Sequence, residues 1–169
     1  MKTQAEKYNL QFIRSLLEQV HDPELPVLSI VDLAIVRDIK YNNDDELEIT
    51  ITPTYSGCPA MDMIALEIKT ILLQHNIHDF KVTTTLIPAW TTDWMSQEAK
   101  DKLKAYGVAP PTPGQSVCHV ELFHEEEAIQ CPNCNSYNTT MISRFGSTAC
   151  KAMYKCNECA EPFDYFKCH

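Results

Sequence analysis

Four cysteines near the C-terminus have the spacing of a metal site. Cys131 and Cys134 form one Cys-x-x-Cys pair, and Cys156 and Cys159 form a second pair after 21 intervening residues. Two thiolates two residues apart can approach one ion from a tight turn, and two such turns complete a tetrahedron with no open position. A redox dithiol is disfavoured because neither pair opens a helix in a βαβ unit. The spacing therefore predicts a structural Zn²⁺ held by these four cysteines, rather than four unrelated buried cysteines.

Three more potential ligands accompany this set: Cys150, Cys168 and the C-terminal His169. Four thiolates saturate a structural zinc, so the extra three could bind a second metal transiently, since soft ligands suit iron, copper and zinc alike. The alternative is that a free cysteine is simply buried. The pattern assigns no role to Cys118. The basic residues near the ligands either offset the negative charge of the zinc site or are ordinary surface residues: Arg144, Lys151, Lys155 and Lys167.

Cys58 is the one cysteine in residues 1–109. It lies in the loop 54–59, between an expected strand and an expected helix start. Because the free N–H groups and the dipole of a helix start stabilise a thiolate, this position predicts a lowered thiol pKa and a reactive cysteine. A small buried residue without reactivity fits the position equally well.

The charge balance limits the classes of partner. The chain has 169 residues and a net charge of -9, and both its parts are acidic. Neither part has the basic excess that phosphate binding requires, so we expect no nucleic-acid and no membrane partner. The polar N-terminus does not resemble a signal peptide, and no segment approaches the ~18 apolar residues that span a bilayer. We therefore expect a cytoplasmic protein with reduced thiols, in which cysteines serve metal or thiol chemistry and not disulfides.

Hydrophobic periodicity predicts an α+β fold, a small sheet with packed helices. We expect helices over 8–20, 60–74 and 96–105, and strands over 34–41, 47–51 and 80–86, the first two strands forming a hairpin. Residues 110–115 form a proline-rich linker. The linker separates an α+β domain, residues 1–109, from a C-terminal zinc ribbon, residues 116–169. A segment this short buries too little apolar surface to fold without a staple such as a metal.

Short motifs in the first domain follow one another in a recognisable order. They are Asp22-Pro23-Glu24, Val31-Asp32-Leu33, Thr52-Pro53, Gly57-Cys58-Pro59 and Pro88-Ala89-Trp90-Thr91, followed by Met95. Over residues 8–107 this order resembles the SufT-like family of iron–sulfur cluster assembly domains. Together with the zinc knuckles, the run 144–151 and the ending 161–169 extend the likeness: the chain resembles the PaaD-type accessory proteins of the phenylacetyl-CoA epoxidase (ring-oxygenase) complex.

The resemblance implies a fold, a role and a set of site residues. The fold is a compact α+β domain followed by a zinc ribbon. The role is maturation of the metal or iron–sulfur centres of a multicomponent oxygenase of phenylacetate degradation, without turnover of its substrate, and the partners are the oxygenase and reductase subunits. Cys58 matches the family's reactive cysteine, and Asp22, Glu24 and Asp32 match its acidic positions. A transient iron or iron–sulfur cluster is the implied cargo.

Transfer of a cluster through one cysteine per domain would favour a homodimer. The sequence departs from the family pattern in two places. Ala34 stands where many relatives have glycine, and residues 117–128 look like an insertion.

Two catalytic classes of function fit the sequence less well. A catalytic di-iron subunit needs two Glu-x-x-His pairs on long helices, and the chain has one such string, residues 121–124, outside any convincing helix. A nucleotide-dependent reductase needs a glycine-rich phosphate loop, and the four glycines are far apart. A ferredoxin spacing is missed by one residue in the tail, so iron–sulfur binding there is a lesser alternative. A structural or electron-transfer subunit of the oxygenase complex is the remaining alternative.

Overall fold

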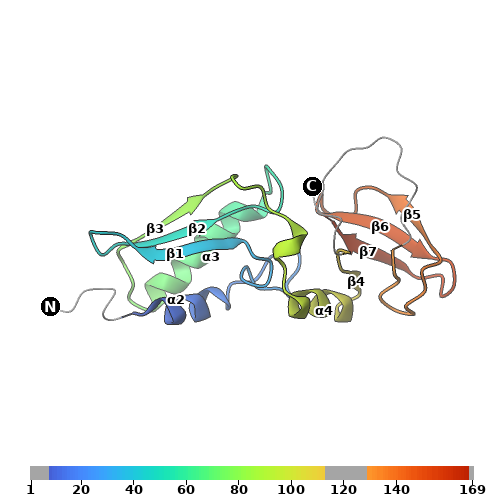
Figure 1. The fold of residues 1–169 in the computed structure, drawn as a ribbon, viewed down its shortest axis with the longest axis horizontal. Helices are drawn as coiled ribbons and strands as arrows, with labels where there is room; N and C mark the ends of the chain where they lie inside the picture. The colour runs from blue at the N-terminus through green and yellow to red at the C-terminus, as the bar shows by residue number, and fades with distance from the viewer. Residues whose placement is uncertain (1–7, 113–128, 168–169) are drawn as a thin grey trace. The chain divides into compact units, whose positions relative to one another are not determined.

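The computed structural model describes residues 8–112 and 129–167, and the chain forms two compact units, Met1–Trp90 and Thr91–His169. Figure 1 shows the first unit as a sheet with helices on one face. Within the described residues, no helix is long and apolar enough to cross a membrane.

The first unit begins with α2, Leu10–Leu17, whose N-cap is Asn9. The Asn9 side chain accepts a hydrogen bond from the Phe12 N–H at 2.7 Å, which satisfies one of the free donors of the first turn. The apolar face of α2 buries Ile13, Leu16 and Leu17. The helix is shorter than the predicted 8–20, because residues 18–19 form a turn ahead of the His21-Asp22-Pro23 stop.

Three strands form the first sheet in the order β1-β2-β3: Val36–Tyr41, Leu47–Ile51 and Phe80–Thr84. β1 and β2 are antiparallel, which confirms the predicted hairpin, and β3 is parallel to β2. The crossover between the parallel strands is α3, Ala60–Gln74, at the predicted bounds. β1 starts two residues later than predicted because Ala34 adopts a left-handed φ of 52° and turns the chain.

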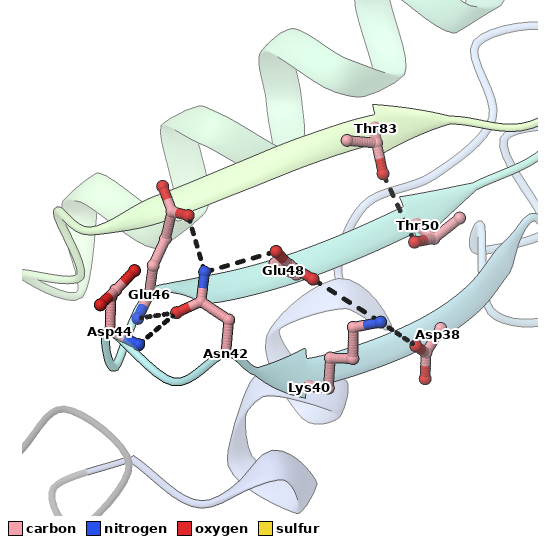
Figure 2. A network of polar contacts seen from close by, with 8 residues as sticks. All are labelled: Asp38, Lys40, Asn42, Asp44, Glu46, Glu48, Thr50 and Thr83. Atoms are coloured by element: carbon pink, nitrogen blue, oxygen red, sulfur yellow. Dashed lines mark hydrogen bonds and ion pairs between the residues drawn. The ribbon is translucent and has the colours of Figure 1, made fainter.

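The two faces of this sheet differ in chemistry because side chains alternate along a strand. Leu47, Ile49 and Ile51 of β2 are buried, as are Ile64 and Ile68 of α3, so they supply a large part of the core of the first unit. The opposite face is polar. Figure 2 shows Lys40 between Asp38 and Glu48, and the Asn42 amide donating to Glu46 and Glu48 at the hairpin turn.

The second unit begins with the short 3₁₀ helix η1, Thr92–Trp94, and with α4, Gln97–Ala105. Ser96 caps the start of α4, because its side chain accepts from the Ala99 N–H at 3.1 Å. Gly107 follows the helix with a φ of 90°, which glycine adopts without the steric cost of a side chain. The predicted helix and its glycine stop are therefore confirmed.

The second sheet has the strand order β4-β7-β6-β5. The bounds are Val108–Ala109 for β4, Thr139–Ser143 for β5, Lys151–Cys156 for β6 and Pro162–Phe166 for β7. β4 pairs with β7, so residues 108–109 belong to this sheet, and the domain boundary at residue 109 stays a prediction. The core is small and contains two of the metal-site cysteines: Ala109, Ile129, Cys131, Ala152, Tyr154, Cys156 and Phe163.

The two faces of α3 give a prediction for the stability of the first unit. Ile68→Ala removes a fully buried side chain and should lower the free energy of unfolding by about 2–5 kcal/mol, through lost burial and a residual cavity. Leu66→Ala, on the same helix but 58% exposed, should change it by no more than about 0.5 kcal/mol. Urea unfolding followed by circular dichroism measures both. Equal costs at the two positions would contradict the assigned orientation of α3.

Candidate functional site

Three loops meet at one end of the first sheet. The Thr52 N–H donates to the Ile35 carbonyl at 2.9 Å, and the Thr85 N–H donates to the Ile51 carbonyl at 2.9 Å. These bonds hold the start of β1 next to the ends of β2 and β3. The loops 21–35, 52–59 and 85–90 therefore leave the sheet at the same end, where the carboxyl ends of parallel strands commonly carry functional residues.

Asp22 and Asp32 shape the first of these loops. Asp22 is 8% exposed, and its Oδ1 accepts from the Glu24 N–H at 2.8 Å and from the Leu25 N–H at 2.9 Å. Asp32 Oδ2 accepts from the Ser29 N–H at 3.0 Å, and Ser29 Oγ accepts from the Asp32 N–H at 3.0 Å. The reciprocal pair resembles a helix capping box. Both carboxylates therefore fold the loop through backbone donors, whatever further role they have.

Trp90 fixes the third loop against the first. Its indole N–H donates to the Leu33 carbonyl at 2.8 Å, and the ring is buried. Buried indole N–H groups need such a partner, so this bond helps to set where residues 85–90 return to the core.

Cys58 lies in the middle loop, half-buried, one residue before the N-cap of α3. The Cys58 N–H donates to the Tyr55 carbonyl at 3.2 Å, and the Cys58 carbonyl accepts from the Met61 N–H at 3.3 Å. Gly57 precedes it with a φ of 84°, a conformation that costs other residues strain. The sulfur is thus held between a tight turn and the first turn of a helix.

The expected lowering of the Cys58 pKa is wrong. Burial raises the pKa of the Cys58 thiol, and hydrogen bonds from the Ala60 backbone and the Tyr55 side chain offset only part of this effect. The negative charges of Glu24 and Asp22 raise the pKa further. The helix start alone therefore does not produce a thiolate here.

The four cysteines of the second unit lie on two turns with the same backbone geometry. The Cys131 N–H donates to the Ser136 carbonyl at 2.9 Å, and the Cys156 N–H donates to the Glu161 carbonyl at 3.0 Å. In each turn the residue after the second cysteine has a left-handed φ of 63°: Asn135 in the first and Ala160 in the second. Asparagine tolerates this conformation, whereas alanine adopts it at a cost of about 1–2 kcal/mol.

The sulfur geometry fits a tetrahedral ion. All four Sγ atoms lie within 4.8 Å of one another, with 3.8 Å between Cys131 and Cys159 and 3.5 Å between Cys134 and Cys156. A tetrahedron with metal–sulfur bonds of about 2.3 Å has edges of about 3.8 Å. Among the residues that the structure describes, these are the only histidine, cysteine or carboxylate side chains grouped in this way.

Backbone donors support this cluster. A hydrogen bond from the Cys159 N–H, with a further one from Glu158, lowers the pKa of the Cys156 thiol to about 7. The Asn157 side chain ties the second turn to the segment before β5 and to the strand itself, donating to Asn138 Oδ1 at 2.9 Å and to Thr140 Oγ1 at 3.0 Å. The four sulfur atoms therefore form a site for a metal ion.

The remaining predicted ligands do not join either site within the described residues. Cys150 is 5% exposed, and its sulfur lies 3.0 Å from Thr148 Oγ1. Lys151, one of the expected counter-charges, is buried and pairs with Asp164 at 3.9 Å. Cys118, Cys168 and His169 lie outside the described residues, as do the expected insertion 117–128 and residues 113–115 of the linker.

Three features of the two sites were not predicted from the sequence. They are the Tyr55 side chain that hydrogen-bonds to Cys58, Ser29 as the hydrogen-bond partner of Asp32, and the left-handed residue after each cysteine pair. Only the last had a signal in the sequence, because asparagine at position 135 is a common left-handed residue.

Two family models match the chain. Residues 10–84 match an iron–sulfur cluster assembly protein family, and residues 115–167 match the PaaD zinc beta ribbon domain. The chain is 48% identical to a putative 1,2-phenylacetyl-CoA epoxidase subunit of Escherichia coli, over 92% of this chain and 91% of that protein.

The first unit also has relatives of its own. The chain is 42% identical to the Fe-S protein maturation auxiliary factor YitW of Bacillus subtilis, over 52% of this chain and 86% of that protein. A crystal structure of a DUF59 domain from Bacillus anthracis matches with a TM-score of 0.51 and 32% identity, over 55% of this chain and 89% of that one. With both family models and the near full-length match in agreement, the chain belongs to the PaaD family, which joins an iron–sulfur assembly domain to a PaaD zinc ribbon.

Proposed function

We propose that this chain is a non-catalytic accessory protein that matures the metal or iron–sulfur centres of a multicomponent phenylacetyl-CoA oxygenase. The observation that carries the proposal is the surroundings of Cys58. A half-buried thiol lies near Glu24 and Asp22, on loops that meet at one end of a domain shared with Fe–S maturation factors.

A single thiol with carboxylate charges in its surroundings suits a cargo that must be released. A saturated set of four thiolates closes a metal site, whereas the Cys58 thiol belongs to no such group and leaves positions open for the ligands of a recipient. An approaching cation would also offset the two negative charges that keep the Cys58 proton in place, so thiolate formation and cargo binding would favour each other. Iron or an iron–sulfur cluster is therefore proposed as transient cargo.

The four-cysteine site has a different proposed role. We assign it a structural Zn²⁺, because four thiolates leave no open position and because the core around Cys131 and Cys156 is small. The alternative function is a structural or electron-transfer subunit of the oxygenase, and co-expression of the oxygenase with and without this chain separates the two. A homodimer, as predicted from the sequence, is part of this proposal.

The zinc assignment predicts that one zinc per chain is lost when one ligand is removed. Cys134→Ala should abolish zinc binding and make residues 129–167 sensitive to protease, because structural zinc couples binding to folding. Cys150→Ala is the matched control, since Cys150 lies outside the four-sulfur group. Metal analysis and limited proteolysis provide the readout. A Cys134→Ala protein that keeps its zinc would refute the assignment.

The charges near Cys58 predict a pH-dependent reactivity. Glu24→Gln removes one negative charge that raises the thiol pKa, so the pKa should fall and alkylation of Cys58 should be faster at any pH below it. Iodoacetamide labelling between pH 7 and pH 10, read on the Cys58 peptide by mass spectrometry, measures the shift. Glu67→Gln, an exposed change on α3, serves as the control. Identical profiles for Glu24→Gln and wild type would remove Glu24 from the site.

The maturation role predicts that the oxygenase needs this chain before turnover and not during it. Oxygenase subunits are expressed with wild type, with Cys58→Ala or without the chain, then purified free of it and analysed for iron, acid-labile sulfide and activity. Co-expression with wild type should give a loaded oxygenase that stays active alone. Omission or Cys58→Ala should give a folded oxygenase deficient in a metal centre.

The opposite pattern would identify a working subunit. Full metal loading without the chain, with activity that depends on adding it to the assay, would support the structural or electron-transfer alternative.

A further inference from the structure

The outer face of the second sheet exposes apolar side chains in one region. Met141 and Tyr154 are paired across β5 and β6 and belong to the core side, whereas Ser143 pairs with Met153. The register shifts between Met141 and Ser143, so Ile142 and Ser143 together oppose Met153. Ile142 is 55% exposed and Met153 is 36% exposed. Ile142 and Met153 therefore both face away from the core.

Phe145 lies in the loop after β5, next to Gly146, which approaches Asp164, the cross-strand partner of Met153, and Phe145 is held in position. Ser143 Oγ accepts from the Phe145 N–H at 3.2 Å and donates to the Phe145 carbonyl at 2.8 Å. The Lys167 ammonium lies 4.5 Å from the centre of the Phe145 ring, a cation–π contact. The ring is nevertheless 60% exposed. An aromatic side chain that is both fixed and exposed loses little conformational freedom on binding, which suits an interface anchor.

Basic side chains lie next to this apolar region, whereas the cross-strand neighbour of Met153 on β7 is Asp164, which pairs with Lys151. Lys155 lies two residues from Met153 on the same face of β6, and Arg144 lies beside Phe145. Arg144 is close enough to Lys167 for the two positive charges to act on each other, because Arg144 adds to burial in lowering the pKa of Lys167. Lys151, by contrast, is buried against Asp164. Three of the four basic residues of the second unit's ribbon therefore border the exposed apolar side chains, on a chain whose net charge is -9.

The relatives differ in which part of this chain they match. The first unit is shared with maturation factors such as YitW, whose match covers 52% of this chain and 86% of that protein. The ribbon occurs in the relative named as an epoxidase subunit, which matches 92% of this chain. A module added to a shared assembly domain is a natural place for the contacts that select one recipient. Exposed aromatic, methionine and arginine side chains are the types enriched in protein interfaces.

We propose that this ribbon face, Ile142, Phe145 and Met153 bordered by Arg144, Lys155 and Lys167, docks an acidic protein surface with an apolar centre on the oxygenase subunit that receives the metal centre. The recipient is thus chosen by the second unit, while the cargo is held by the first. This inference rests on the proposed maturation role for the identity of the partner. The chemistry of the face fixes the kind of surface that the partner must present.

Binding of purified oxygenase subunits, made in cells that lack this chain, tests the docking face directly. Phe145→Ala should weaken the dissociation constant by about tenfold or more, as loss of an anchor does. Arg144→Glu with Lys155→Glu should weaken it similarly, and raising the salt from about 50 to about 300 mM should weaken wild type more than this variant. Tyr137→Ala, at 62% exposed in the same unit, should bind like wild type. Unchanged zinc content verifies that each variant is folded.

The outcomes separate the docking face from the transfer role. Wild-type affinity in both Phe145→Ala and the charge-reversed variant would overturn the docking face, as would the absence of any binding by wild type. Cys58→Ala should bind normally and fail to load metal. A chain that binds through this face but never alters the metal content of the oxygenase would refute the maturation role and leave the docking face standing.

Discussion

The number of cysteine sulfur atoms that the backbone brings together determines which kind of metal binding each unit can support. In the second unit, two turns with matching hydrogen bonds bring four Sγ atoms within 4.8 Å of one another. Such a set binds an ion and leaves no open position, so its contribution is to the fold. In the first unit the Cys58 sulfur belongs to no such group, so a cargo bound there would need ligands from elsewhere. Under the proposed function, this difference separates a permanent ion from a transient cargo.

The acidic loop links folding to the chemistry of Cys58. Asp22 accepts hydrogen bonds from two backbone N–H groups, so the loop fixes the position of its carboxylate. The negative charge of that carboxylate raises the pKa of the Cys58 thiol. A carboxylate that folds a loop is already desolvated and oriented, which lowers the reorganisation that binding a cation would need. The same negative charges raise the pKa of the Cys58 thiol, which disfavours the thiolate, the reactive form of cysteine.

Patterns within short segments predicted most helices and strands, but they did not reveal contacts between residues far apart in the sequence. The bounds of α3 and the four grouped cysteines follow from periodicity and spacing, which are properties of short segments. The raised pKa of Cys58 depends on Glu24 and Asp22, which are far from it in sequence, so a helix-start rule alone gave the wrong direction. The late start of β1 has a local cause that periodicity did not show, because Ala34 is a non-glycine residue in a left-handed conformation that glycine usually supplies. The pairing of β4 with β7 likewise joins residues that no local pattern connects.

The ribbon also explains why a small, metal-dependent module can serve as a recognition surface. Its core side is occupied by Tyr154, Phe163 and two ligand cysteines, so the zinc site and the core stabilise the sheet from one face. The other face exposes Ile142 and Met153, whereas Lys151 and Phe166 are buried farther along that same face. Exposed apolar side chains on an isolated small sheet would favour aggregation if the sheet were loose. A metal bound by the two cysteine turns would hold the sheet rigid, so that Phe145 could remain exposed without the module losing its structure. Under the two proposals, stability from zinc and recognition through the opposite face would be two consequences of the same arrangement.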